Sequence, residues 1–136
     1  MRPLIATILS AAMLAAAPAA VAKDRPTGEE KLARMLEGRA AGEPRDCITL
    51  SSVTSSQVVD KTAIVYRVGS TLWVNRPRGG AESLDGDDNI LVTKLTGSQL
   101  CSIDTIQLHD RNSHMYAGFV SLGEFVPYRK VDTAAK

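Results

Sequence analysis

The feature that most constrains this chain is a pair of apolar stretches separated by glycine and serine at positions 69 and 70. Ala63–Val68 precedes the two residues and Thr71–Asn75 follows them. Glycine at the first central position supplies the positive φ of a type II′ turn, which joins two antiparallel strands through a two-residue loop. This turn also sets the register of the two strands. The expected facing pairs are Val68 with Thr71, Tyr66 with Trp73, and Val65 with Val74.

Both faces of this predicted hairpin are apolar, because successive side chains along a strand point to opposite faces. One face carries Ile64, Tyr66, Val68 and Trp73, and the other carries Val65, Leu72 and Val74. A hairpin with two apolar faces is covered on both sides, in a layered structure or in a small closed barrel.

Other stretches of the chain also have strand-like patterns. They are Cys47–Leu50, Gln57–Val59, Ile90–Leu95, Asp104–His109, Met115–Val120 and Glu124–Tyr128. Pro127 suits an edge strand, because proline has no N–H to donate to a neighbouring strand. We therefore predict an α+β, mainly β fold. One N-terminal helix packs on a five- to seven-stranded antiparallel sheet, either open or closed into a small barrel.

The predicted helix covers residues 27–42. Thr27 and Glu30 form a capping box, in which each side chain accepts a hydrogen bond from the other residue's backbone N–H. Apolar residues recur on one face at Leu32, Met35 and Leu36. Candidate ends are the glycines at 38 and 42. This pattern fits a helix that binds a partner, and it fits better a helix packed on its own sheet.

Residues 1–22 have the pattern of a cleavable secretory signal peptide. Arg2 precedes an apolar stretch over residues 3–17, and small side chains at 20 and 22 predict cleavage between Ala22 and Lys23. The alternative is an uncleaved membrane anchor, but the apolar stretch is shorter than the roughly 20 residues that span a bilayer. The mature protein is expected to be periplasmic or secreted and to have no membrane span.

Cleavage leaves residues 23–43 as an N-terminal helical segment, 44–130 as a β-rich domain and 131–136 as a flexible tail. Without Arg2 the chain has 15 basic and 15 acidic residues. A net charge of zero gives no general attraction to polyanions, so nucleic-acid binding is disfavoured.

Two cysteines, Cys47 and Cys101, remain after cleavage. An even number of cysteines in an exported protein favours a disulfide bond between them. The alternative is two buried free thiols. A catalytic thiol is less favoured, because neither cysteine belongs to a Cys-x-x-Cys pair.

Two turns contain weak candidate metal ligands. Asp85, Asp87 and Asn89 place oxygen atoms at alternate positions, but the glycine and glutamate of an EF-hand loop are missing. His109, Asp110 and His114 flank a second turn and would suit zinc or copper. Solvent-exposed turn residues explain both patterns better, so no metal site is assigned.

The chain has no nucleophile elbow, no phosphate-binding glycine loop and no convincing pair of carboxylates. No catalytic residue and no cofactor are therefore predicted. The Arg-Pro-Arg-Gly-Gly sequence at 76–80 could offer guanidinium groups and backbone N–H groups to an anion. An ordinary surface loop is the favoured interpretation.

Several segments resemble a family of small exported proteobacterial proteins that is classed as a domain of unknown function. They are Cys47-Ile48, Val59-Asp60, Trp73–Asn75, Leu100–Ile106 and Gly118–Tyr128, and the resemblance covers residues 44–128. Many members carry another cysteine just before the Leu-Gly pair, which is Leu122-Gly123 here, whereas this chain has Phe-Val-Ser at 119–121. The resemblance implies a periplasmic or envelope location. It implies no activity, ligand or catalytic residue.

These observations favour a non-enzymatic periplasmic module that binds a protein, a peptide or an envelope component. Two alternatives use the histidine turn: a small periplasmic hydrolase acting through His109 and Asp110, and a metal-binding protein.

Overall fold

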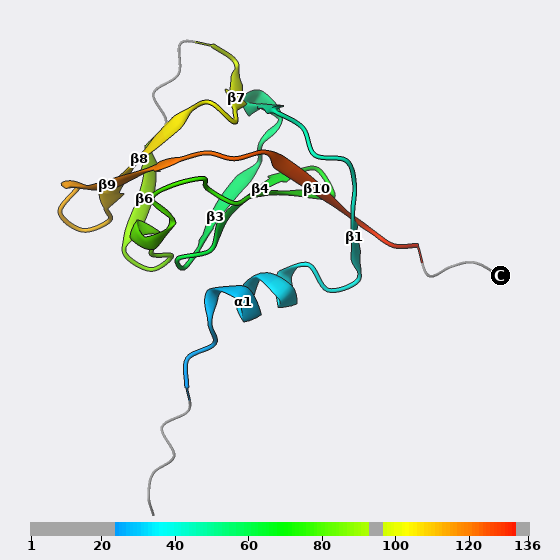
Figure 1. Cartoon of the computed structure of the whole chain (residues 1–136), viewed down its shortest axis with the longest axis horizontal. Coiled ribbons are helices and arrows are strands. Elements are labelled where there is room, and N and C mark those ends of the chain that lie inside the picture. The colour runs from blue at the N-terminus through cyan, green and yellow to red at the C-terminus, as the bar shows by residue number, and fades with distance from the viewer. Residues whose placement is uncertain (1–23, 93–96, 133–136) are drawn as a thin grey trace, which may run out of the picture.

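The computed structural model of the chain describes residues 24–92 and 97–132. The predicted signal peptide, with its cleavage position between Ala22 and Lys23, lies outside these residues, as does the predicted strand's Leu95. The described part contains one α-helix and ten strands (Figure 1). The helix is α1 (Gly28–Met35). The strands are β1 (Arg39–Ala41), β2 (Cys47–Thr49), β3 (Ser55–Val59), β4 (Ala63–Val68), β5 (Thr71–Asn75), β6 (Asn89–Val92), β7 (Gln99–Cys101), β8 (Thr105–Asp110), β9 (Tyr116–Ser121) and β10 (Phe125–Lys130).

The predicted hairpin is β4 and β5, and all three predicted facing pairs are present. Gly69 has a φ of +58°, whereas Ser70 does not have a positive φ, as a type II′ turn requires. The local sequence therefore determines both the turn and the register.

The strands form three antiparallel sheets. A five-stranded sheet has the order β1-β10-β5-β4-β3, a three-stranded sheet has the order β6-β8-β9, and β2 pairs with β7. The predicted mainly β fold is confirmed. The small closed barrel, which the sequence left open as an alternative, does not form among the described strands, because β3 and β6 each end a sheet. On the opposite side β9 leads directly into β10 (Figure 1). A bridge between Gly79 and Ser121 covers part of the outer edge of β9.

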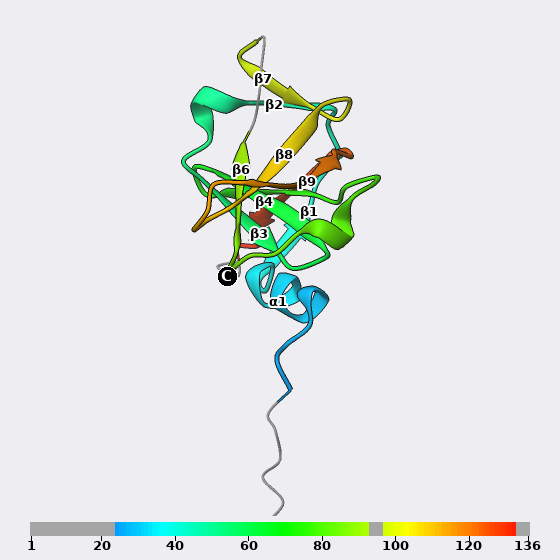
Figure 2. The same cartoon turned by 90° about the vertical axis from the view of Figure 1, so that its left-hand side faces the viewer.

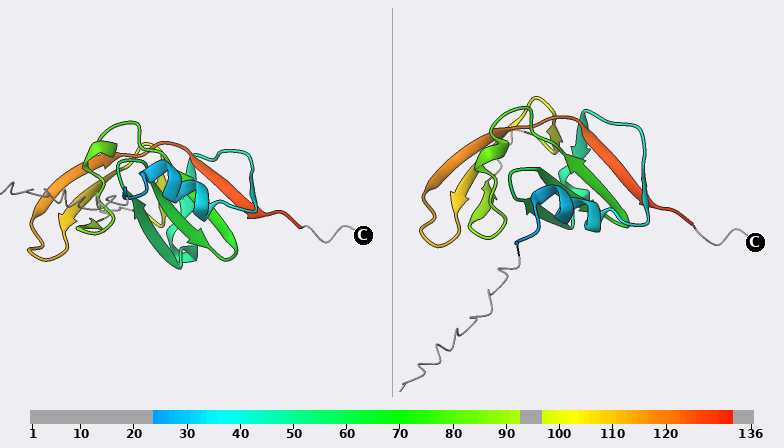
Figure 3. Two further views of the ribbon diagram at one scale, coloured as in Figure 1. Left: turned by 90° about the horizontal axis from the view of Figure 1, so that it is seen from below. Right: turned by 60° about the horizontal axis from the view of Figure 1, so that its bottom comes forward.

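Two apolar clusters lie on opposite faces of the central hairpin, as the two apolar faces predict. The larger cluster lies between the sheets and includes Ile48, Ile64, Tyr66, Leu84, Leu100, Ile106, Leu108, Val120, Leu122 and Phe125. The smaller cluster lies under α1 and comprises Leu32, Val59, Ala63, Val65, Leu72 and Val74. Figure 3 shows α1 crossing the underside of the five-stranded sheet.

The helix begins as predicted but ends earlier. Both hydrogen bonds of the Thr27–Glu30 capping box are present, and Leu32 is buried against the sheet. The predicted helix over residues 27–42 is wrong after Met35, because α1 ends there and Arg39–Ala41 forms β1. Gly38 takes a φ of +71°, which ends the helical geometry and turns the chain toward β10.

The prediction that Pro127 lies in an edge strand is also wrong, since β10 lies between β1 and β5. Gly42 N donates to Pro127 O, so the backbone of Pro127 faces the β1 side. The β1 ladder ends at the Ala41–Tyr128 pair. The missing N–H of Pro127 therefore interrupts no ladder.

Candidate functional site

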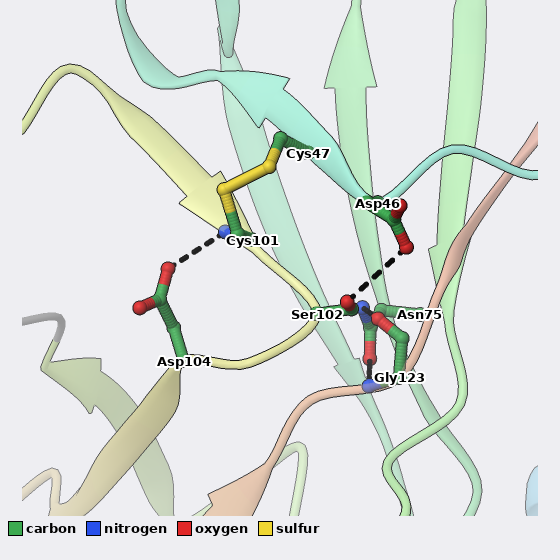
Figure 4. The surroundings of a disulfide bond; sticks show 7 residues. All are labelled: Asp46, Cys47, Asn75, Cys101, Ser102, Asp104 and Gly123. Carbon is green, nitrogen blue, oxygen red and sulfur yellow. Dashed lines mark hydrogen bonds between the residues drawn. A yellow bond between two sulfur atoms is a disulfide. The ribbon is translucent and has the colours of Figure 1, made fainter.

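The predicted disulfide bond joins Cys47 in β2 to Cys101 in β7. The two residues face each other directly in the antiparallel pair, with their Cα atoms 4.0 Å apart. Asp104 Oδ2 accepts a hydrogen bond of 2.7 Å from Cys101 N, which fixes the turn that follows the bridge (Figure 4). The bridge secures the two-stranded sheet, whose Ile48 and Leu100 enter the larger core.

A buried amide holds the junction between β9 and β10. Asn75 Nδ2 donates to Gly123 O at 2.7 Å, and Gly123 N donates to Asn75 Oδ1 at 3.0 Å (Figure 4). The side chain is fully buried. The two hydrogen bonds pair the Asn75 amide with the backbone of Gly123, much as a neighbouring strand would pair with it, so Asn75 has a structural role.

One ring nitrogen of His109 and the Asp110 carboxylate bond within the histidine turn, whereas the buried His109 Nε2 has no hydrogen-bond partner among the described residues. His109 Nδ1 lies 3.0 Å from His114 O, and Asp110 Oδ1 accepts hydrogen bonds from the backbone N–H groups of Asn112 and Ser113. Those bonds hold the pKa of the Asp110 carboxyl below its usual range. His109, Asp110 and His114 are close in sequence, but in the described structure their side chains do not form a group that could hold a metal ion.

The Asp85–Asn89 loop is arranged in the same way. Asp85 Oδ1 accepts from the backbone N–H groups of Asp87 and Asp88, while Asn89 Nδ2 turns inward and donates to Ser83 O at 2.7 Å. In residues 24–92 and 97–132, no three His, Cys, Asp or Glu side chains are grouped to hold a metal ion.

Asp60 is an anchoring residue that sequence reasoning missed. Its carboxylate pairs with Lys31 Nζ of α1 and accepts a hydrogen bond of 2.7 Å from Gly86 N. The hydrogen bond from Lys31 is the main reason that the pKa of Asp60 lies below its ordinary value, and the hydrogen bond from the Gly86 N–H is the second. One carboxylate thereby ties the helix, the end of β3 and the 85–89 loop together. Nothing in the local pattern signals this role, because the three segments are distant in sequence.

The two arginines of residues 76–80, a candidate anion-binding segment, donate hydrogen bonds to oxygen atoms of the protein itself. Arg76 makes two hydrogen bonds to the Glu29 carboxylate, at 2.6 and 3.0 Å. Arg78 donates to Leu122 O and Ser102 O. Both arginines border a groove of about 530 Å³, but Asp46 and Glu124 border it as well. This mixed charge does not favour an anion.

The outer face of the three-stranded sheet is the most distinctive surface of the described chain. Its neighbouring rows, by strand pairing, are Val92, Gln107 and Phe119, and Ile90, His109 and Tyr116. Tyr116 and Phe119 are 58% and 53% exposed, and Met115 beside them is 69% exposed. The Tyr116 ring stands edge-on to the His109 ring, with centroids 6.2 Å apart. We call the six residues of these two rows the outer face; Met115 lies next to it in the chain.

Sequence reasoning assigned β9 to the sheet but missed the exposure of its aromatic residues. The available signal was the run from Met115 to Gly123, which contains no charged residue. A run of this kind also fits a buried strand, so exposure could not be inferred without the neighbouring strands.

No protein-family model matches the chain, and neither a curated protein nor a solved structure shows a significant match to it. Within the described part, no helix has the length and apolar character needed to cross a membrane.

Proposed function

We propose that this chain is an exported, non-enzymatic interaction module that binds a partner polypeptide through the outer face. The observation that carries the proposal is the exposure of Tyr116 and Phe119 on one face of the sheet, next in the chain to the exposed Met115. Large apolar side chains gathered on a surface are typical of protein-binding sites, and aromatic residues contribute most to such interfaces.

Two features support the location outside the cytoplasm. The first is the signal-peptide pattern of residues 1–22, and the second is the Cys47–Cys101 disulfide. Disulfide bonds persist in oxidising compartments. The resemblance to small exported proteobacterial proteins would place the module in the periplasm or the envelope.

The chemistry of the outer face favours a polypeptide partner over a charged one. Its residues include no Asp, Glu, Lys or Arg. A surface without cations has little attraction for nucleic acid or anionic lipid headgroups. An apolar surface of another protein or peptide complements it.

Site-specific photo-crosslinking in the periplasm tests the proposal. Gln107, in the middle of the outer face, is replaced by a photoreactive phenylalanine, and discrete adducts are identified by mass spectrometry. We expect a specific adduct that is lost on adding Tyr116→Ser and Phe119→Ser. The matched control is Ile103→Ser, which removes an 82% exposed apolar side chain outside the outer face and should leave the adduct unchanged.

Adducts that persist in the Tyr116→Ser, Phe119→Ser variant would overturn the proposal, as would loss of the same adducts in the Ile103→Ser control.

A further inference from the structure

The seam between the two larger sheets contains a cleft flanked by edge strands on both sides. β3 ends the five-stranded sheet and β6 ends the three-stranded sheet, and the two strands approach each other in both Figure 1 and Figure 2. A cavity of about 360 Å³ lies between them. It is lined by Ser56, Gln57, Val58, Gly86, Asn89, Ile90, Leu91 and Arg111. We call this space the β3–β6 cleft.

The backbone of β3 presents free polar groups to this cleft. Val68 and Thr71 flank the two-residue turn and form a hydrogen-bonded pair. The backbone N–H and C=O groups of even-numbered β4 residues therefore point toward β5, and those of odd-numbered residues point toward β3. Their partners in β3 are also odd-numbered. The N–H and C=O groups of Ser56 and Val58 therefore point away from β4. The position of Gly86 agrees with this direction, because a Cβ built there would lie 2.8 Å from Val58 O.

The backbone of β6 presents free groups from the other side. Arg111 N donates to Asp88 O at 2.6 Å, just before β6 begins. Because the pairing alternates along the strand, the backbone N–H and C=O groups of even-numbered β6 residues point toward β8. The N–H and C=O groups of Leu91 consequently point away from β8. Among the described residues, neither Ser56 N nor Leu91 N makes a hydrogen bond outside the strand ladders.

Both edges also lack the usual protection against pairing with another chain. Exposed edge strands are commonly guarded by lysine, proline or an inward-pointing charge. Neither Ser55–Val59 nor Asn89–Val92 contains a charged residue or a proline. In contrast, the outer edge of β9 is covered around Phe119–Ser121 by the segment that contains Gly79 and Gly80.

We infer that the β3–β6 cleft accepts an extended segment of a partner polypeptide, which adds as a strand between β3 and β6. Backbone hydrogen bonds to Ser56 and Leu91 hold the segment, and its alternate side chains point toward and away from the core. The segment carries a carboxylate, because Arg111 is the one charged side chain that lines the cleft among the residues the structure describes. Its guanidinium is oriented there by hydrogen bonds to Asp87 O and Asn89 O, at 3.1 and 3.4 Å.

This inference rests on the proposed function in one respect, namely that the partner is a polypeptide. Ile90 belongs both to the outer face and to the wall of the cleft. A strand added beside β6 would extend the three-stranded sheet, so its outward side chains would continue the outer face. The partner would thus bind by its backbone in the cleft and by apolar side chains beside Ile90 and Val92, the residues that β6 contributes to the outer face.

The test uses the mature, disulfide-bonded protein and a phage-displayed library of random dodecapeptides. The affinity of the selected peptide is compared for Ser56→Pro and Ser56→Ala. Both variants lack the exposed hydroxyl, but only proline lacks the N–H that points into the cleft. We expect Ser56→Pro to weaken binding at least tenfold and Ser56→Ala to leave it within twofold. Arg111→Gln should weaken binding as much as replacement of the peptide's carboxylate by its amide.

A second measurement covers the case in which Ser56→Pro does not fold. Single backbone nitrogens of the selected peptide are methylated in turn and tested against the unaltered protein. Strand addition predicts that methylation is tolerated at alternate positions and weakens binding tenfold or more at the positions between them.

Failure to select any peptide, equal affinity of the two Ser56 variants, or uniform tolerance of methylation would overturn the inference. Self-association of the protein without peptide binding would overturn it too. The photo-crosslinks from position 107 would still test the outer face independently. If Tyr116→Ser, Phe119→Ser abolishes the adduct while Ser56→Pro leaves peptide affinity unchanged, the outer face binds a partner without strand addition.

Discussion

Gly80 occupies a position that no other residue fits. Its φ of +83° belongs to the left-handed region, and a Cβ built there would lie 2.2 Å from Phe119 O. The close approach allows residues 79–83 to cover the edge of β9, where Ser121 N donates to Gly79 O. Gly38 also has a positive φ, of +71°, but its Cβ would meet nothing within 4 Å.

These two glycines separate backbone strain from steric overlap. We expect Gly38→Ala to lower the free energy of unfolding by about 1 kcal/mol, the cost of a left-handed alanine. Gly80→Ala should lower it by about 3 kcal/mol, because the chain must also move away from Phe119 O. Urea unfolding followed by circular dichroism measures both changes. Equal effects of the two substitutions would show that the segment moves without cost.

Asp60 predicts a pH dependence of stability with a definite sign. The folded-state pKa of its carboxyl lies below the ordinary value of 3.8, chiefly because Lys31 bonds to it. A carboxyl whose pKa is depressed stabilises the fold above its unfolded-state pKa, and this contribution is lost as the pH falls through the folded-state pKa. Asp60→Asn should therefore destabilise the protein by about 1 kcal/mol at pH 7. The difference from the unaltered protein should shrink as the pH falls below the ordinary pKa of 3.8 and through the lower folded-state pKa.

Denaturant unfolding at several pH values measures this difference. The control is Asp87→Asn, which changes an aspartate of the neighbouring loop whose carboxylate makes no hydrogen bond among the described residues. A gap between the Asp60→Asn and unaltered proteins that stays constant from pH 7 to pH 3 would contradict the assigned role.

At the scale of elements, α1 depends on its first turn because it has only eight residues. The Thr27 hydroxyl accepts from Glu30 N, and Glu30 Oε2 accepts from Thr27 N at 2.7 Å. Isolated helices of this length are unstable in water, so the cap and the packing of Leu32 must hold the helix.

Thr27→Ala should lower the free energy of unfolding by about 1 kcal/mol, the usual cost of an N-cap. Thr27→Ser keeps the hydroxyl and should cost only a few tenths of that amount. Thermal unfolding of the three proteins gives the comparison. Equal midpoints for the alanine and serine variants would mean that the hydroxyl does not cap the helix.

At the scale of the whole molecule, the disulfide joins positions 54 residues apart and links β2 to β7. In the loop-closure description, a cross-link over this separation stabilises the fold by about 4 kcal/mol, through the lost freedom of the unfolded chain. That is a large part of the net stability of a small domain.

Replacing both cysteines by alanine should therefore lower the free energy of unfolding by about 4 kcal/mol. Reduction of the unaltered protein should give the same value, which controls for the side-chain change. Hydrogen exchange should show the first loss of protection in Cys47–Thr49 and Gln99–Cys101. A decrease below about 1 kcal/mol would mean that the unfolded chain is already compact around the two cysteines.

What the sequence by itself determined is local, or follows from a covalent constraint. The Gly69 turn specified the register of β4 and β5, the spacing of Thr27 and Glu30 specified the helix start, and an even number of cysteines specified Cys47–Cys101. Each of these signals acts between residues that are close in sequence, or has a single possible partner. Backbone geometry and valence therefore decide the outcome without reference to the rest of the fold.

Only the tertiary structure decided the placements that depend on distant segments. Arg39–Ala41 leaves the helical pattern because β10 offers its backbone hydrogen bonds, and Pro127 is accepted inside a sheet because β1 ends beside it. The exposure of Phe119 and the free edges at the β3–β6 cleft likewise follow from how two sheets meet. An apolar strand can be buried or exposed with the same sequence, and the choice depends on which neighbours fill its other face.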